Sequence, residues 1–145
     1  MQRLITIFRT IIVAGLVLAI AGGLIDLVFP DLVPAQINDA YEAYTIEEAA
    51  DIHIAMGFLA LVVLIVVLVA TVGLLLLKRW ARALAFWVTV VSTLFYPFLG
   101  PYLYSGLGLM LTEASMLLWG AVLAMAYFSE LRTYFERQPA PEDMT

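Results

Sequence analysis

Four polar side chains in or beside the apolar stretches of this sequence could do chemistry: Asp26, His53, Tyr96 and Glu113. A carboxylate and an imidazole can exchange a proton or hold a cation, and a phenol can donate a hydrogen bond to a carboxylate. Glu113 lies about 9 Å along the axis from the start of its apolar stretch. If that stretch crosses a membrane, an acid at its centre costs roughly 2.5–3.5 kcal/mol, and less at shallower depth. Two interpretations are open: Glu113 pins its helix to a neighbour, or it binds a proton or ligand.

His53 limits the cofactors, because it is the only histidine and the chain has no cysteine. A haem with two histidine ligands cannot form within one chain, and no motif supports a His/Met haem. A zinc site from His53 with Asp26, Asp51 or Glu113 lacks a diagnostic spacing. No cofactor, metal or catalytic residue is therefore predicted. We expect His53 to hydrogen-bond an acid such as Asp26, which lies at the C-terminal end of a helix, where the dipole disfavours a carboxylate. Tyr96 could serve Asp26 as an alternative donor.

Membrane helices must position these residues, because the composition is that of a membrane protein. Of 145 residues, 64% are apolar and 13% are charged, and the mean hydropathy is +1.01. Apolar stretches occupy residues 4–29, 52–77, 83–98 and 107–128, and each approaches or exceeds the ~20 residues that cross the hydrocarbon. The first is too long for a signal peptide, so we interpret it as a retained helix.

The sequence therefore predicts an all-α fold, an integral membrane bundle of four transmembrane helices. The single domain covers residues 1–137, and a disordered cytoplasmic tail is expected at 138–145. The expected helices are residues 4–29, 46–79, 81–99 and 107–135. The second is expected to begin near Ile46, because Thr45 and Glu48 have the spacing of a capping box.

The charges predict how these helices are oriented. The seven Lys and Arg residues are Arg3, Arg9, Lys78, Arg79, Arg82, Arg132 and Arg137. The connections at residues 30–51 and 99–106 contain none of them, so the positive-inside rule places both termini in the cytoplasm. The acids at or in the first outer connection are Asp26, Asp31, Asp39, Glu42, Glu47, Glu48 and Asp51. This acidic outer loop disfavours the binding of nucleic acid. The expected localisation of the protein is the cytoplasmic (inner) membrane of a bacterium or archaeon.

Small residues predict which helix faces pack, because they let helices approach closely in lipid. The residues that form this packing stripe are Gly15, Ala19, Gly23, Gly57, Ala60, Gly120 and Ala124. At 100° per residue, Asp26 continues the stripe of the first helix, while His53 and Glu113 share the faces of the small residues on theirs. We therefore advance the hypothesis that Asp26, His53, Tyr96 and Glu113 converge in the outer half of the bundle.

Three segments resemble a pattern in small bacterial membrane proteins that have four helices and no known activity. They are residues 78–82 (Lys-Arg-Trp-Ala-Arg), the Gly100-Pro101 turn and residues 126–129 (Ala-Tyr-Phe-Ser). The resemblance covers roughly the C-terminal half of the chain. It implies the four-helix topology and carries over no site residues.

These observations favour a non-enzymatic accessory or interaction subunit that works through helix packing and the outer loop. Its expected partners are membrane lipid and either a second copy or a larger membrane protein. One alternative is a small oligomeric transporter or channel that uses Glu113 and His53 as proton- or ion-binding groups. Another is a lipid- or quinone-binding module. An enzyme is not expected, because the chain offers no convincing pair of nucleophile and base.

Overall fold

The computed structural model describes residues 2–47, 50–95, 97 and 103–136, and for residues 44–47 and 50–56 it describes the backbone only. Every regular element among them is helical, which confirms the prediction of an all-α fold. The elements are α1 (Gln2–Val28), the 3-10 helix η1 (Pro30–Leu32), α2 (Ala35–Glu47), α3 (Ala50–Leu75), α4 (Arg79–Phe95), α5 (Gly106–Phe128) and α6 (Arg132–Glu136).

Three of these helices are long and apolar enough to cross a membrane. They are α1, the segment Gly57–Leu75 of α3, and α5. The helix α4 has 17 residues, which is at the lower limit of the length that spans the hydrocarbon. The chain is thus compatible with a membrane protein, and α4 is not among the three candidate spans.

The first long connection contains a helix that the sequence did not suggest. The carbonyl of Pro34 accepts hydrogen bonds from the N–H groups of Ile37 and Asn38, and α2 follows as far as Glu47. Thr45 therefore lies inside α2, so the expected helix start near Ile46 is wrong. A spacing of three residues, as between Thr45 and Glu48, is also about one turn inside a helix, which has 3.6 residues per turn. This spacing therefore does not by itself mark the start of a helix.

The last expected helix is also divided. Its long part, α5, ends at Phe128, and Ser129 follows in an extended conformation with φ −97° and ψ 174°. The hydroxyl of Ser129 accepts a hydrogen bond from the N–H of Leu131 at 3.2 Å. This side-chain bond competes with the helical pattern, so the chain turns before α6 begins.

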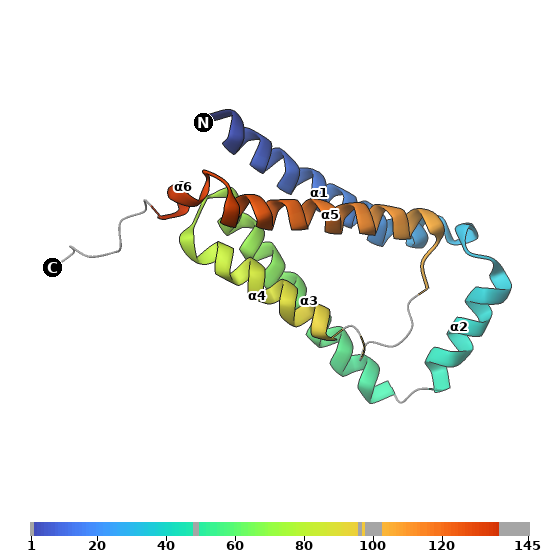
Figure 1. Ribbon diagram of the computed structural model, residues 1–145. Helices are drawn as coiled ribbons and strands as arrows, with labels where there is room; N and C mark the ends of the chain where they lie inside the picture. Colours follow the sequence, from blue (N-terminus) through green and yellow to red (C-terminus); the bar gives the residue numbers. More distant parts are fainter. Residues whose placement is uncertain (1, 48–49, 96, 98–102, 137–145) are drawn as a thin grey trace.

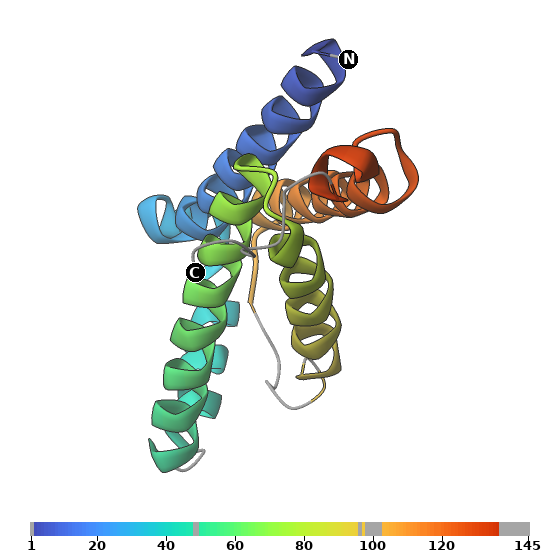
Figure 2. The ribbon, with the colours of Figure 1, turned by 90° about the vertical axis from the view of Figure 1, so that its left-hand side faces the viewer.

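The long helices form two pairs rather than one parallel bundle. The most extensive contacts join α1 to α5 and α3 to α4. The two pairs meet at the end that carries α6 and diverge toward the end that carries α2 (Figures 1 and 2). We call the first the basic end, because it holds Arg9, Lys78, Arg82 and Arg132, and the second the acidic end.

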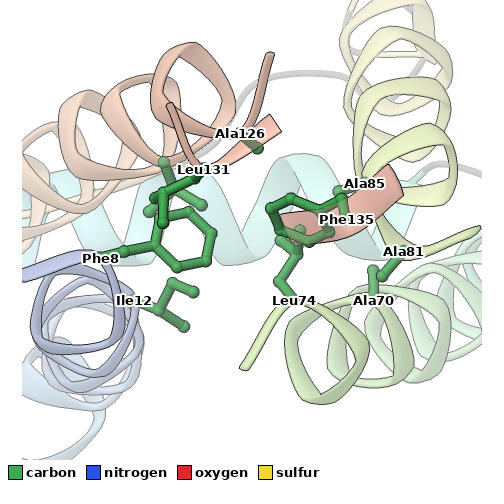
Figure 3. Packing of buried hydrophobic residues seen from close by; sticks show 10 residues of the cluster. Phe8, Ile12, Ala70, Leu74, Ala81, Ala85, Ala126, Leu131 and Phe135 are labelled. Atoms are coloured by element: carbon green, nitrogen blue, oxygen red, sulfur yellow. The ribbon is translucent and has the colours of Figure 1, made fainter. Parts of the chain in front are cut away.

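The closed core lies at the basic end (Figure 3). Its fully or almost fully buried apolar side chains are Phe8, Ile12, Ala70, Leu74, Ala81, Ala85, Val122, Ala126, Leu131 and Phe135. The rings of Phe8 and Phe135 meet edge to face, with centroids 6.1 Å apart and planes at 81°. Four alanines let α3, α4 and α5 approach closely, and the two large rings fill the space between them.

A tight turn joins α3 to α4 within this core. The N–H of Lys78 donates to the carbonyl of Gly73, and the N–H of Leu77 donates to that of Leu74, which is the Schellman pattern. Leu77 takes the left-handed conformation with φ 54°, a place usually given to glycine. Gly73 is needed here, because a Cβ on it would lie 2.6 Å from the Cβ of Ala81.

Candidate interhelical binding site

An interhelical cavity of about 300 Å³ lies among α1, α3, α4 and α5. Most of its wall is apolar, and hydroxyl groups and one indole provide the polar part. The lining residues are Ile11, Ile12, Gly15, Leu16, Ala19, Val63, Val67, Thr71, Thr89, Ser92, Thr93, Ser115, Met116, Trp119 and Val122. The volume falls at the lower end of the range for small-molecule sites.

The hydroxyl protons around the cavity are already used inside the protein. Thr71, Ser92 and Thr93 each donate to the carbonyl four residues earlier, over 2.7–2.9 Å. Ser115 on α5 donates across to the carbonyl of Gly15 on α1 at 2.9 Å. What these groups can still offer a ligand is lone pairs, so the site suits a molecule that is apolar or that brings one donor.

Trp119 and Thr89 join α5 to α4 at the cavity wall. The indole N–H of Trp119 donates to the hydroxyl oxygen of Thr89 at 2.8 Å, and that hydroxyl donates to the carbonyl of Ala85 at 2.8 Å. Thr89 and Trp119 are thereby held in place by hydrogen bonds. None of the described residues that line the cavity is charged, so the wall offers no fixed charge to an ion.

Asp26 holds the acidic end of the α1–α5 pair. Its Oδ2 accepts a hydrogen bond from the N–H of Ser105 at 3.0 Å, and the hydroxyl of Ser105 accepts from the N–H of Gly108 at 3.0 Å. The carboxylate thus lies at the N-terminus of α5, where the helix dipole favours negative charge. A Cβ on Gly108 would lie 2.6 Å from Oδ2, so a larger residue there would displace the carboxylate.

The hypothesis of a four-residue polar cluster finds only part of its residues described. Asp26 obtains its donor from the backbone of Ser105 rather than from the expected His53 or Tyr96. Tyr96 lies outside the described residues, and so does the side chain of His53. Glu113 is exposed on α5, is not among the residues that line the cavity, and shares no hydrogen bond with Asp26. The convergence of the four residues therefore stays a prediction.

The packing face of α1 includes Gly15, as expected, but passes through Gly22 instead of Gly23. Gly15 lies against Leu118, as a Cβ on it would be 3.5 Å from that side chain. Gly22, rather than Gly23, faces α5: a Cβ on Gly22 would lie 2.7 Å from Oγ1 of Thr112, whereas one on Gly23 would meet nothing within 4 Å. Gly15, Gly22 and Asp26 are separated by seven and four residues, so they share one helix face. The sequence supports this face equally with the one through Gly23.

The expected stripes of the other helices point away from the part of the chain that the structure describes. A Cβ on Gly57 or Gly120 would meet nothing within 4 Å, and Ala60 and Ala124 are exposed. Ala19 is also exposed but lines the cavity. Gly23, Gly57, Ala60, Gly120 and Ala124 thus make no close helix contact within the described part of the chain, and their role as a packing stripe stays a prediction. Small residues permit close approach, but a complementary neighbour decides whether it occurs.

Arg82 links α4 to α5 and α6, a role that sequence reasoning missed. Its side chain is 13% exposed, and Nη1 donates to the carbonyl of Ala126 at 3.3 Å. The guanidinium lies 5.3 Å from the ring centroids of Tyr127 and Phe135. In the sequence, Arg82 lies among the charged residues expected at the membrane interface. The signal for its burial is the neighbouring pair of small residues, Ala81 and Ala85, which lie one helical turn apart.

Glu136 completes this network at the protein surface. It accepts a hydrogen bond from Nε of Arg132 at 2.8 Å and lies 3.7 Å from Nη2 of Arg82. The bond from Arg132 holds the pKa of the Glu136 carboxyl below its ordinary value, and the charges of Arg132, Arg82 and Arg79 act in the same direction. The same bond raises the pKa of Arg132.

No protein family, curated protein or solved structure matches the chain. Among the residues that the structure describes, no three His, Asp or Glu side chains form a group able to hold a metal ion.

Proposed function

We propose that this chain is a four-crossing protein of a cytoplasmic membrane that holds an apolar molecule in its interhelical cavity. The candidate ligands are the chain of a lipid and a membrane quinone, and the protein performs no chemistry on them. The cavity of about 300 Å³ carries the proposal, since its wall is mainly apolar and uncharged. In this role the protein is a binding module or accessory subunit rather than an enzyme.

The proposed topology is supported by the distribution of charge. The start of α1, the α3–α4 turn and α6 belong to the basic end, and the positive-inside rule places such an end in the cytoplasm. In this arrangement α2 lies outside, and α4 crosses with Arg79 and Trp80 at its inner edge. The alternative in which α4 lies along the surface would put the C-terminal helix on the opposite side from the N-terminus.

Single-cysteine variants test this topology directly, because the chain has no cysteine of its own. An impermeant maleimide should label Asp39→Cys and Leu103→Cys from outside intact cells. Lys78→Cys and Thr133→Cys should react only in inverted vesicles. Labelling of Lys78→Cys and Leu103→Cys from the same side would reject the crossing by α4.

Ligand binding can be followed by the fluorescence of Trp119. With Trp80→Phe and Trp87→Phe, Trp119 remains as the single tryptophan, and it lines the cavity. We expect saturable quenching by decylubiquinone or by a brominated fatty acid in detergent. Ala19→Phe fills part of the cavity and should weaken binding about tenfold or more, because overpacking typically costs 1–3 kcal/mol.

Val17→Phe is the matched control for the cavity. Val17 lies on the same helix, is 58% exposed and does not line the cavity. Binding should survive this change. Quenching that does not saturate with either probe, or that weakens equally in both variants, would rule out the cavity as the site.

A second function, self-association or docking on a larger membrane protein, is supported by the outer face of α5. Leu117 is 76% exposed, nothing lies opposite Gly120, and Glu113 is exposed within a candidate membrane span. We expect Gly120→Leu to abolish cross-linking of copies in the membrane if this face is an interface. Gly23→Leu, on an equally open position of α1, is the control. Unchanged cross-linking in Gly120→Leu would exclude this face.

The transporter alternative has less support from the geometry. It requires Glu113 to face a pathway, and Glu113 is exposed on α5 and does not line the cavity. If it were correct, proton- or ion-dependent flux in liposomes would disappear in Glu113→Gln. Flux that persists in this variant, or no flux in the unmodified protein, would favour the binding function.

A further inference from the structure

A second hollow of about 570 Å³ opens at the basic end, apart from the interhelical cavity. Its lining residues are Arg79, Trp80, Arg82, Ala83 and Tyr127, and we call it the inner hollow. It shares no lining residue with the interhelical cavity. Two guanidinium groups and two aromatic rings that carry a polar N–H or O–H therefore surround one space.

The charge around the inner hollow is positive on balance. Arg79 is exposed and makes no hydrogen bond or ion pair with any part of the chain that the structure describes. The carboxylate beside Arg82 is that of Glu136, at 3.7 Å, and its closer contact is with Arg132 at 2.8 Å. The single negative charge of Glu136 thus faces the charges of Arg132, Arg82 and Arg79, so the surroundings of the inner hollow keep a net positive charge.

The chemistry of the lining suits a phosphodiester at a membrane surface. A guanidinium can bind two phosphate oxygens at once, which an ammonium cannot do with the same geometry. Trp80 is 51% exposed, and tryptophan and tyrosine favour the level of the lipid headgroups. Basic pockets between membrane helices on the cytoplasmic side are a recognised form of anionic-lipid site.

An apolar surface continues from the hollow along α4. Ala83 lies one helical turn beyond Arg79, and Phe86 and Trp87, at the next turn, are 43% and 61% exposed. The rings of Phe86 and Tyr127 meet edge to face with centroids 6.1 Å apart, so the apolar surface adjoins the hollow. Charge at one end and exposed apolar side chains beyond it match a molecule with a phosphate head and acyl chains.

We propose that the inner hollow binds the headgroup of an anionic phospholipid, with Arg79 as the main phosphate contact and the acyl chains along Phe86 and Trp87. The proposal rests on the membrane location of the chain and is independent of the ligand in the interhelical cavity. Arg82 has a structural role as well, so Arg79 is the residue on which the test should depend.

The fluorescence of Trp80 reports on this site. With Trp87→Phe and Trp119→Phe, Trp80 remains as the single tryptophan. In phosphatidylcholine vesicles we expect brominated phosphatidylglycerol to quench Trp80 more strongly than the same fraction of brominated phosphatidylcholine. Arg79→Gln should reduce the relative affinity for phosphatidylglycerol about fivefold, the usual contribution of one basic side chain near anionic lipid.

Two matched variants separate a specific contact from general attraction. Arg79→Lys retains the charge and should keep part of the preference, whereas Arg3→Gln removes an exposed charge elsewhere and should keep all of it. Equal quenching by the two lipids, or the same loss in Arg79→Gln and Arg3→Gln, would overturn the proposal. Unchanged circular dichroism of Arg79→Gln would show that the protein remains folded.

A soluble-anion measurement identifies the source of the phosphate. Inorganic phosphate and glycerol phosphate are added to the single-tryptophan protein in vesicles of pure phosphatidylcholine. We expect no change that depends on Arg79. A saturable change that is lost in Arg79→Gln, without any preference for phosphatidylglycerol, would assign the hollow to a free phosphate and reject the lipid.

Discussion

The basic and acidic ends of this protein use small residues with opposite results. At the basic end Ala70, Ala81, Ala85 and Ala126 are buried, because Phe8 and Phe135 fill the space that they leave. Toward the acidic end Gly57 and Ala60 on α3 are exposed, and a Cβ on Gly57 would meet none of the described residues within 4 Å. A small residue therefore allows a helix contact, and a large or polar complement on the neighbour creates it.

The two ends also differ in how they use charge. Arg82 connects α4 with α5 and α6 through a carbonyl, a carboxylate and two rings. At the acidic end Asp26 connects two helices, α1 and α5, through the N–H of Ser105. We expect the basic end to control stability and the acidic end to contribute less. Four changes, from the largest expected effect to the smallest, test this difference.

Phe135→Ala should cause the largest loss. Phe135 on α6 is fully buried against α1 and α4, and truncation of a buried phenylalanine costs about 3–5 kcal/mol. Phe128→Ala removes the same atoms from a side chain that is 91% exposed, so it should change little. Unfolding of both variants in mixed detergent would measure the difference. Equal losses would mean that the core at the basic end does not dominate.

Gly22→Ala should have the next largest effect, about 1–3 kcal/mol. A Cβ there would press against Oγ1 and the backbone N of Thr112 at 2.7 and 3.1 Å, and the backbone cannot give way cheaply. Gly23→Ala meets open space and should be neutral or slightly stabilising, since alanine favours a helix over glycine. The same unfolding measurement applies, and the opposite order would restore the stripe through Gly23 as the packing face.

Asp26→Ala should cost about 1 kcal/mol, the net value of a typical hydrogen bond. It removes the acceptor for the N–H of Ser105 at the start of α5. Asp26→Asn keeps an oxygen acceptor and should recover most of the loss. Hydrogen exchange at the amide of Ser105 would report the change locally. A loss as large as that of Phe135→Ala would remove the distinction between the two ends.

The smallest effect should come from Glu136. Because its pKa is lower in the folded protein, its contribution is fully present above the ordinary pKa of glutamate and is lost as the pH falls through the lowered value. The melting temperature of the unmodified protein should therefore decline in this acidic range more than that of Glu136→Gln. Glu130→Gln carries the same change of charge nearby and should follow the unmodified protein. Identical pH profiles for Glu136→Gln and the unmodified protein would contradict this role.

Helical periodicity in the sequence does not decide which face of a helix packs against a neighbour at the candidate site. It predicted that Asp26 continues a packing face of the first helix, but Gly22 and Gly23 are neighbours, and a shift of 100° decides which of them meets α5. The expected partners of Asp26 were side chains, whereas the observed one is the backbone of Ser105. Backbone donors are available at every helix start, so the sequence does not single one out.

Composition and local pattern determined the all-helical fold, because an apolar stretch of membrane length must satisfy its backbone hydrogen bonds within a helix. They also predicted that Lys and Arg accumulate at one end of the helices and acids in the first outer connection. The pairing of α1 with α5 and α3 with α4, the closed core at the basic end and the uncharged cavity between the pairs came from the tertiary structure. These features depend on which side chains meet across helices, and residues such as Phe8 and Phe135 are separated by nearly the whole chain.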